Sequence, residues 1–372
     1  MAKPTRARRK IRYAIVGLGW ISQTAVMPAF QNAENSEMTA LVSDDAEKLQ
    51  ALGKQYNIEN LYLYDQYDEC LNSPQVDAVY IGLPNHLHRE YAVRAANAGV
   101  HVYCEKPMAV TERECEEMIR AAEDNAVKLM IAYRLHFEAG NLEAIQVVNN
   151  GTIGDPQFFT STFTQQVEKD NVRWMPTAQG GGPLYDLGVY CINASRYLFR
   201  AEPTQVQAAM TYHDTDETSR VENKVAATLR FPDERLATFV CGFGQEGNSH
   251  YTVIGTQGML RADPAYTFMG DINLHITRAG QTETRNFPAR DQFGPQLVYF
   301  SDCVLHDREP EPSGVEGLND VRIIRALHQA AETGRAVSLH LTEKQKPGKR
   351  QEISRPPIES PQLVKAESPS GE

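Results

Sequence analysis

The chain has 372 residues, of which 41% are hydrophobic and 23% charged, ordinary values for a globular protein with a sizeable core. This length predicts two domains. The formal net charge of −11 argues against a nucleic acid or an anionic membrane as a partner, because phosphate groups bind to basic surfaces. The sequence also lacks an apolar run near the ~20 residues of a membrane span.

The six cysteines are scattered and include no CxxC pair. This spacing is typical of reduced thiols in a cytoplasmic enzyme, and it predicts neither a disulfide framework nor a zinc or other metal site. The basic stretch 1–10 leads into a strand, not into the apolar region and cleavage site of a signal peptide, so we expect a cytoplasmic protein. Residues 343–372 are rich in Lys, Glu, Pro and Ser, which predicts a disordered tail.

The first predicted strand, residues 11–16, runs into a glycine turn that carries a dinucleotide-binding fingerprint. In this turn Gly17 allows a tight bend, and Gly19 lets a pyrophosphate approach the backbone at the start of a helix. The third glycine of the fingerprint is replaced by Ser22. Pro28 lies inside the predicted helix and should kink or end it. The cofactor-binding candidates from this turn are Gly17, Gly19, Trp20 and Ile21.

The second predicted strand ends at polar residues that bear on the choice of nucleotide. An acidic side chain at this distance from the glycines can accept a hydrogen bond from the ribose 2′-hydroxyl, a role that falls to Asp44 and favours NAD. Ser43 and Lys48 would instead cradle the 2′-phosphate of NADP. Alternatively, Asp44 and Asp45 only cap the helix that follows. We expect NAD or NADP as the cofactor, with NAD slightly favoured.

Three further strands are predicted at residues 76–83, 100–104 and 128–133, and they alternate with helices. Alternation with short connections predicts an α/β fold, with a parallel, doubly wound Rossmann sheet over residues 1–135. In such a sheet, ligands bind beyond the carboxyl ends of the strands. We therefore expect the residues at these three ends to line one crevice and to bind the cofactor: Leu83, Pro84, Asn85 and His88, then Glu105 and Lys106, then Arg134.

Lys106 is the residue of this set that most suggests chemistry. A short apolar strand runs directly into Glu105 and Lys106, and Pro107, which has no N–H and a locked φ, restricts the backbone there. The ammonium is expected to face the crevice. By itself, the tripeptide is weak evidence and favours an ordinary strand-to-helix turn with a solvated lysine.

From residue 136 onward, predicted strands succeed one another with few helices. This pattern is typical of a large, mostly antiparallel open sheet, and we assign residues 136–342 to this second α/β domain. A helix predicted at 184–199 follows three glycines and carries Asp186 and Tyr190 on one face. These two residues either face a ligand or serve as a cap and a half-buried aromatic. The loop predicted at 288–300 receives no role.

Several motifs together resemble the glucose–fructose oxidoreductase and inositol dehydrogenase (Gfo/Idh/MocA-type) family over nearly the whole chain. Within the family, the similarity is greatest to the glucose–fructose oxidoreductase and dihydrodiol/xylose dehydrogenase branch, where a tyrosine stands four residues beyond the aspartate, as Tyr190 does. The motifs are GLGWIS, VDAVYIGLPNHLH, GVHVYCEKPMAV, KLMIAYRLHF, GGGPLYDLGVYCINASRYLF and GLNDVRIIRALHQAAETGR.

The resemblance implies an NAD(P)-dependent enzyme that transfers hydride between nicotinamide and a hydroxyl of a sugar or related polyol, with aldose to lactone as the expected case. It implies catalytic roles for Lys106, Asp186 and Tyr190, with Tyr190 as the base and Asp186 bound to a neighbouring sugar hydroxyl. It also implies a homodimer or homotetramer through the C-terminal sheet. Two alternatives stay open: an aldose oxidoreductase with permanently bound NADP(H), and a non-catalytic nucleotide-sensing protein.

Overall fold

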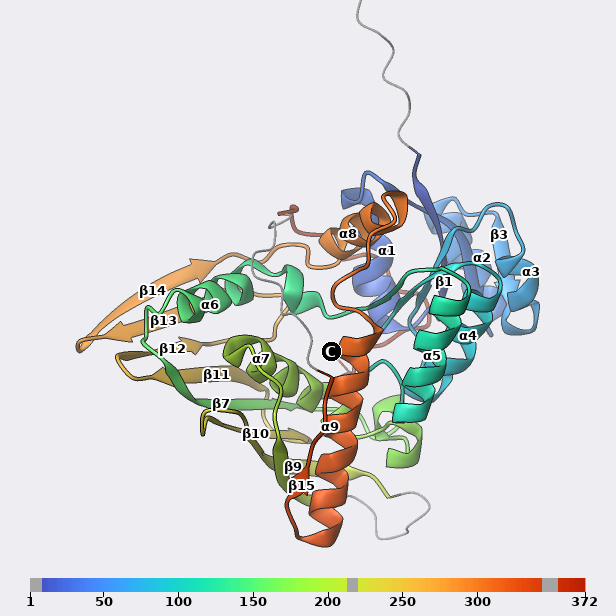
Figure 1. Ribbon diagram of the computed structural model, residues 1–372. Helices are drawn as coiled ribbons and strands as arrows, with labels where there is room; N and C mark the ends of the chain where they lie inside the picture. Colours follow the sequence, from blue (N-terminus) through green and yellow to red (C-terminus); the bar gives the residue numbers. More distant parts are fainter. Residues whose placement is uncertain (1–8, 213–219, 343–353, 372) are drawn as a thin grey trace, which may run out of the picture.

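The computed structural model describes residues 9–212, 220–342 and 354–371, and its strands form two separate sheets (Figure 1). Residues 1–8 lie outside the described residues, so the structure does not bear on the prediction that this stretch is not a signal peptide. Within the described residues, one sheet has six parallel strands in the order β3-β2-β1-β4-β5-β6. This is the doubly wound Rossmann arrangement, so the predicted fold class is confirmed.

The Rossmann strands β1, β4, β5 and β6 are almost entirely buried, because helices cover both faces of the sheet, whereas the edge strand β3 is half-buried. The bounds of the strands in this sheet are β1 (Ile11–Val16), β2 (Ser36–Ser43), β3 (Asn60–Leu63), β4 (Ala78–Ile81), β5 (His101–Cys104) and β6 (Leu129–Ile131). The helices between them are α2 (Ala46–Tyr56), α3 (Tyr67–Leu71), α4 (His88–Asn97) and α5 (Glu112–Asp124). Helix α5 begins at a capping box, in which Thr111 Oγ1 accepts from Glu114 N and Glu114 Oε2 accepts from Thr111 N.

The first Rossmann helix is irregular at Pro28. A π-helical turn, η1 (Ser22–Val26), passes into a single α-turn, α1 (Met27–Ala29), and then into a 3₁₀ turn, η2 (Phe30–Asn32). The π-turn lies directly before the proline, where an ordinary α-helix would lose a hydrogen bond. The predicted disturbance is therefore present, but the helical path continues through Pro28.

The second sheet has nine strands in the described residues, in the order β14-β13-β12-β11-β7-β10-β9-β8-β15. Neighbouring strands are antiparallel except for β7 and β10. The strands are β7 (Pro156–Gln165), β8 (Gln205–Tyr212), β9 (Glu222–Arg230), β10 (Leu236–Phe243), β11 (Asn248–Gly255), β12 (Gly258–Ala262), β13 (Ile272–Arg278), β14 (Gln281–Phe287) and β15 (Val337–Ser338).

Among the described residues, helices cover one face of this large sheet and leave the other uncovered. Helices α6 (Ala139–Asn149), α7 (Val189–Phe199) and α9 (Gly314–Thr333) pack against it on the same side (Figure 1). Since side chains alternate along a strand, the residues between the buried ones point to the opposite face. Four large apolar side chains there are 41–50% exposed: Phe158, Val240, Ile254 and Met259.

Residues 294–305 correct one sequence-based prediction, because they form a helix, α8 (Gly294–Leu305), where a loop was predicted over 288–300. Asp291 Oδ1 accepts hydrogen bonds from the backbone N–H groups of Phe293 and Gly294 and so caps the helix start. Leu297 and Phe300 are completely buried in the same apolar cluster as the Rossmann strands. Burial of each side chain contributes ~1.5–3 kcal/mol to the stability of the fold. Through α8, a late part of the chain thus packs against the first sheet.

The C-terminal segment also departs from expectation. Composition predicts disorder over 343–372, whereas residues 354–371 lie against the rest of the chain without forming a helix or strand. Arg355 forms an ion pair with Glu34, and Ile358 and Val364 pack against the Rossmann cluster. These contacts are too few and too scattered to leave a pattern in the sequence. Among the described residues, no helix is both long and apolar enough to cross a bilayer.

Candidate active site

A cavity of about 860 Å³ lies where the carboxyl ends of the Rossmann strands meet the second sheet and its connecting loops. Every site residue proposed from the sequence lines it, so residues far apart in the chain converge on one crevice. These residues are Gly17, Gly19, Trp20, Ile21, Ser43, Asp44, Lys48, Leu83, Pro84, Asn85, His88, Glu105, Lys106, Arg134, Asp186 and Tyr190. Their individual roles remain predictions.

The glycine turn forms a bare backbone wall of this cavity. Gly17 has φ +89°, and a Cβ there would lie 2.5 Å from the carbonyl oxygen of Gly82. A Cβ at Gly19, by contrast, would meet no atom within 4 Å, so open space faces the backbone at this position. Ser22 closes the turn by donating from Oγ to the Gly17 carbonyl, at 2.6 Å. This geometry fits the pyrophosphate of a dinucleotide at the start of a helix.

The adenosine end of the cavity separates the two roles that the sequence left open for its aspartates. Asp45 is the N-cap of α2 and accepts from the backbone N–H of Lys48 at 2.9 Å. Asp44 is exposed at the rim of the cavity, while Ser43 is buried beside it. Helix capping therefore does not require Asp44, which lines the cavity with Ser43 and Lys48 and accepts a hydrogen bond from Ser43 Oγ at 3.3 Å.

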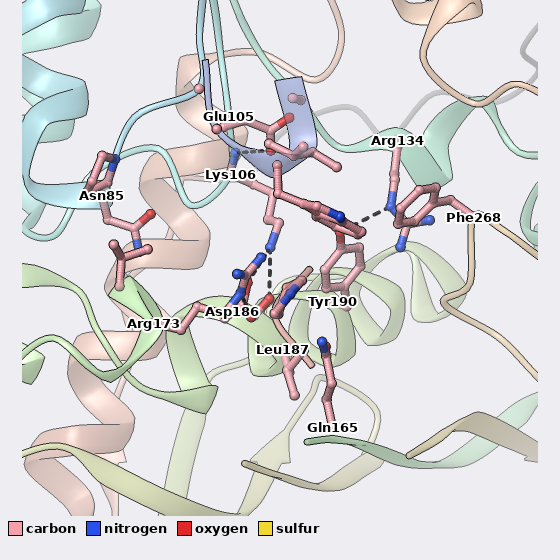
Figure 2. Close-up of a pocket in the computed structure, with 18 of the residues that line it drawn as sticks. Asn85, Glu105, Lys106, Arg134, Gln165, Arg173, Asp186, Leu187, Tyr190 and Phe268 are labelled. Atoms are coloured by element: carbon pink, nitrogen blue, oxygen red, sulfur yellow. Dashed lines mark hydrogen bonds and ion pairs between the residues drawn. The ribbon is translucent and has the colours of Figure 1, made fainter. Parts of the chain in front are cut away.

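Lys106, Asp186 and Arg173 form a charged cluster at the other end (Figure 2). The ammonium of Lys106 donates to the Asp186 carbonyl at 2.9 Å and to Asp186 Oδ1 at 3.1 Å. Arg173 Nε binds the second carboxylate oxygen at 2.8 Å. Burial alone would raise the pKa of Asp186, but the two cations outweigh it and lower the pKa to about 2. The carboxylate is thus charged and held at both oxygens.

Lys106 stays positively charged for a related reason. Burial of its side chain lowers the pKa, but the negative charges available at Tyr190, Asp186 and Glu105 outweigh this and raise it above its ordinary value. The neighbouring Glu105 has the opposite balance, because burial dominates and raises its pKa. Tyr80 Oη donates to Glu105 Oε1 at 3.0 Å.

Tyr190 is half-buried and lies between two cations. Arg134 Nε donates to its phenol oxygen at 3.2 Å (Figure 2). The Lys106 ammonium lies 4.7 Å from the ring centroid, and the Arg134 guanidinium lies 4.9 Å from it. The ring also packs against Phe163 and Tyr266. The phenol oxygen therefore has a fixed position, next to positive charge.

The helix that carries Asp186 and Tyr190 occupies the predicted range but starts irregularly. It begins with a π-helical turn, η8 (Leu184–Gly188), before α7. Such turns occur often at functional sites. The preceding glycines, 180–182, pack closely, because an added Cβ at each would meet another atom at 2.8 Å or less. At Gly180 the neighbour is Asn85, whose Nδ2 donates to the Gly180 carbonyl at 2.7 Å.

Two residues predicted to bind cofactor are engaged mainly by protein atoms. The ring nitrogens of His88 lie 2.9 Å and 2.8 Å from the carbonyl oxygens of Pro107 and Leu83. Burial lowers the pKa of His88, so the ring is neutral and donates to only one of them. Besides Tyr190, Arg134 donates to Gln292 at 2.7 Å and to backbone carbonyls of 266 and 267. Both side chains line the cavity, but their hydrogen bonds are made to protein groups, which they hold in place.

Some cavity residues were missed by sequence reasoning, chiefly Arg173, Tyr64, Gln165 and Phe268. Arg173 lies in a 3₁₀ turn, η6 (Val172–Trp174), within the irregular connection between β7 and η8. Phe268 packs edge-on against Trp20 of the glycine turn, with ring centroids 5.8 Å apart. Neither residue belongs to a motif. The glycine run that follows Arg173 is the one signal that pointed to this loop.

Comparisons with known proteins give the same picture. Residues 11–133 match the family model "Oxidoreductase family, NAD-binding Rossmann fold", and residues 141–261 match "GFO/IDH/MocA C-terminal domain". The chain is 31% identical to a D-xylose 1-dehydrogenase [NADP(+)] of Haloarcula marismortui over 341 residues, which is 90% of this chain and 95% of that protein. It is 30% identical to D-xylose 1-dehydrogenase (NADP(+)) 2 of Haloferax volcanii, over 88% and 99%.

Solved structures are similar along most of their length. The aldose-aldose oxidoreductase from Caulobacter crescentus, in complex with glycerol, is 39% identical and superimposes with a TM-score of 0.84, covering 89% of this chain and all of that one. A 3-ketoreductase from Actinomadura kijaniata, in complex with NADP and TDP-benzene, is 25% identical with a TM-score of 0.80, covering 87% and 98%.

Proposed function

This chain belongs to the Gfo/Idh/MocA oxidoreductase family, and on that basis we infer that it is an NAD(P)-dependent enzyme that transfers hydride between a nicotinamide and a hydroxyl of a sugar or related polyol. One observation carries the inference from the structure. The bare glycine turn and the cluster of Lys106, Asp186 and Tyr190 lie in the same cavity. A dinucleotide on the turn and a sugar at the cluster would therefore share one enclosed space.

The roles of the cluster follow from its contacts. The nicotinamide, when bound, supplies the hydride acceptor or donor. In the oxidative direction, Tyr190 Oη, as a phenolate, would take the proton of the substrate hydroxyl and become a neutral phenol, and the positive charges of Lys106 and Arg134 stabilise the negative charge on that oxygen before the transfer. In the reductive direction the phenol returns that proton.

Asp186 serves the cluster mainly through the cations that it holds. Its two carboxylate oxygens bind Lys106 and Arg173, which fixes the direction of the ammonium. Each oxygen has a second lone pair, so the carboxylate also accepts a hydrogen bond from a neighbouring sugar hydroxyl. Arg173 donates from Nε to the same carboxylate and holds it in place, so we assign Arg173 as a positioning residue of the site.

For the cofactor we propose NADP(H) rather than NAD. The slight preference for NAD that Asp44 suggested finds no support, because both dehydrogenase relatives are named for NADP(+) and the ketoreductase structure contains NADP. Asp44 is exposed at the rim, where water and salt screen its charge. Ser43 and Lys48 line the same end of the cavity and supply a hydroxyl and an ammonium for a 2′-phosphate.

A second candidate is transfer between two sugars without release of the dinucleotide. The 39% identity to a protein named aldose-aldose oxidoreductase favours it. Aldose oxidation to a lactone would then be one half of the cycle, and reduction of a second aldose the other half.

The uncovered face of the large sheet supports a further proposal, that of a homo-oligomer. Four apolar side chains at 41–50% exposure on neighbouring strands are unusual for a face in water, and a second copy of the chain would bury them. We also propose a cytoplasmic location, because all six cysteines are buried and unpaired, as expected of a reducing compartment.

A nicotinamide-absorbance screen tests the proposed function. NAD and NADP are offered separately with aldoses, inositols and trans-dihydrodiols. We expect reduction of NADP with at least one aldose. A screen that stays flat, in protein that binds dinucleotide, would favour the nucleotide-sensing alternative.

A further inference from the structure

A segment near the C-terminus contacts the Rossmann domain beside the glycine turn at one end and lines the cavity at its other end. We call Val364–Pro369 the C-terminal strap. At the adenosine end, the backbone N–H of Val364 donates to Gln23 Oε1 at 2.7 Å, and Gln23 Nε2 donates back to the Val364 carbonyl at 2.9 Å. Gln23 itself is buried in the turn η1 that follows the glycines. This end of the strap is therefore joined to the glycine turn through a reciprocal pair of hydrogen bonds.

Lys365 attaches the strap beside the residues that would bind the adenosine ribose. Its ammonium lies 2.9 Å from Asp45 Oδ2 and 2.8 Å from Glu47 Oε2. Asp45 is the N-cap of the helix that carries Lys48, and Asp44 precedes it. The ammonium thus offsets two of the three carboxylates at the end of the cavity where a 2′-phosphate would bind. The backbone of Lys365 is left-handed, with φ 44°, a conformation that a lysine adopts only when its surroundings hold it.

The other end of the strap lies on the second sheet's connecting loop. The carbonyl of Pro369 accepts from the backbone N–H of Glu168 at 2.9 Å. Pro369 is buried and lines the cavity, as Val172 and Arg173 do. Four residue steps separate Lys365 from Pro369, which span at most about 14 Å. The strap thus runs a short path between the Rossmann half and the loop after β7, and its last residue, Pro369, lines the cavity that both halves form.

From these contacts we propose that the C-terminal strap is part of the cofactor site and retains the bound dinucleotide. This inference rests on the proposed function and extends it to residues outside the family's motifs. A dinucleotide on the glycine turn leaves only after the strap detaches from one side. The anchors are ion pairs and single hydrogen bonds near the surface, so the strap opens by local unfolding. Exchange of the dinucleotide is therefore slowed rather than prevented, which suits a cofactor that remains bound over many turnovers.

The test measures the dissociation rate of NADPH directly, from the change in nicotinamide fluorescence when bound NADPH is displaced by excess NADP. Three variants are compared with the wild type. One ends at Leu363 and lacks the strap, and a second, Lys365→Met, keeps the aliphatic stem but removes the charge. The third, Glu359→Gln, is a matched control, since it alters an exposed residue of the same segment, upstream of the strap.

We expect dissociation to accelerate about tenfold or more in the truncated chain, and by less in Lys365→Met, with the control unchanged. The wild-type rate should also rise with salt, because screening weakens the Lys365 ion pairs, and Lys365→Met should lose most of that salt dependence. The amount of dinucleotide that co-purifies with the protein should fall in the same order.

Equal dissociation rates in the wild type, the truncated chain and Lys365→Met would overturn the strap proposal. If the truncated chain fails to fold, the rate and salt dependence of Lys365→Met decide the question alone. Failure of the proposed function looks different, because full-length protein would then bind neither NADPH nor NADH. Loss of sugar oxidation with unchanged NADPH dissociation would also count against the strap, since it would place the effect elsewhere.

Discussion

Replacing Tyr190 by phenylalanine removes one oxygen atom and little else. The ring keeps its packing against Phe163 and Tyr266, and the Lys106 ammonium keeps its place over the ring. Arg134 loses one acceptor, at 3.2 Å, but retains Gln292 and two backbone carbonyls. The fold and the glycine turn should therefore be unaffected, while the proton acceptor of the reaction is gone.

The expected loss is the contribution of a general acid–base group, about 10²–10⁴ in turnover. This corresponds to about 3–5 kcal/mol in the activation free energy. The assay is steady-state and single-turnover reduction of NADP by the best aldose, together with the dissociation constant of NADPH, which should stay within about twofold of the wild type. Tyr197→Phe is a matched control, because Tyr197 lies on the same helix and its hydroxyl binds Glu311, outside the cavity.

Unchanged turnover of Tyr190→Phe with every accepted substrate would refute the reasoning. An equal loss in Tyr197→Phe would also refute it, since the effect would then come from the helix as a whole. A loss confined to KM would assign Tyr190 to substrate binding and would remove it from proton transfer.

Three further predictions follow from the site and the uncovered sheet face. Lys48→Ala should raise the KM for NADP about tenfold and leave the KM for NAD unchanged, because the lysine is proposed to bind the 2′-phosphate. Lys54→Ala, an exposed change on the same helix, is the control and should alter neither KM. Equal effects of Lys48→Ala on both cofactors would contradict the 2′-phosphate role. Because the folded-state pKa of Asp186 (about 2) lies below its ordinary 3.8, its stabilising effect of roughly 2 kcal/mol is complete above about pH 5 and is lost as the pH falls toward 2. Acid unfolding of Asp186→Asn should accordingly be less steep in that window, and a parallel curve would count against the cluster. Val240→Asp should convert the proposed oligomer to monomers, as measured by light scattering, because it places a charge on the apolar face. Asp233→Asn, an exposed loop change, should leave the oligomer intact. A monomeric wild type would disprove the interface.

The Rossmann half follows closely from sequence because most of its strands are buried on both faces and end at recognisable polar residues. Strand β1 has the predicted bounds, and the three strand ends at Asn85, Lys106 and Arg134 meet at one cavity. Strands β3, β13 and β14 were not predicted. The sequence of β14, QTETRNF, is mostly exposed and has no apolar alternation, whereas β13 does alternate, with Ile272, Leu274 and Ile276 buried. Helix α8 was missed because Gly294 and Pro295 suggest a loop, although proline is favourable in a first helical turn.

The candidate site shows a similar division between motif and loop. Lys106 and Tyr190 lie 80-odd positions apart, yet each follows a pattern with a known place in the fold, so their meeting was predictable. Arg173 was not, because its position depends on the path of an irregular connection packed against three glycines. The strap could not be predicted for a different reason. Its contacts are a few hydrogen bonds and the ion pairs of one lysine, and a Pro- and Ser-rich composition gives no sign of them.

The most direct test of the account is a crystal structure of the protein with NADPH and an unreacted aldose. The account predicts one sugar hydroxyl within hydrogen-bond distance of both Tyr190 Oη and Lys106 Nζ, with its carbon facing the nicotinamide ring. A sugar bound away from these two atoms, or a nicotinamide ring turned away from them, would contradict it.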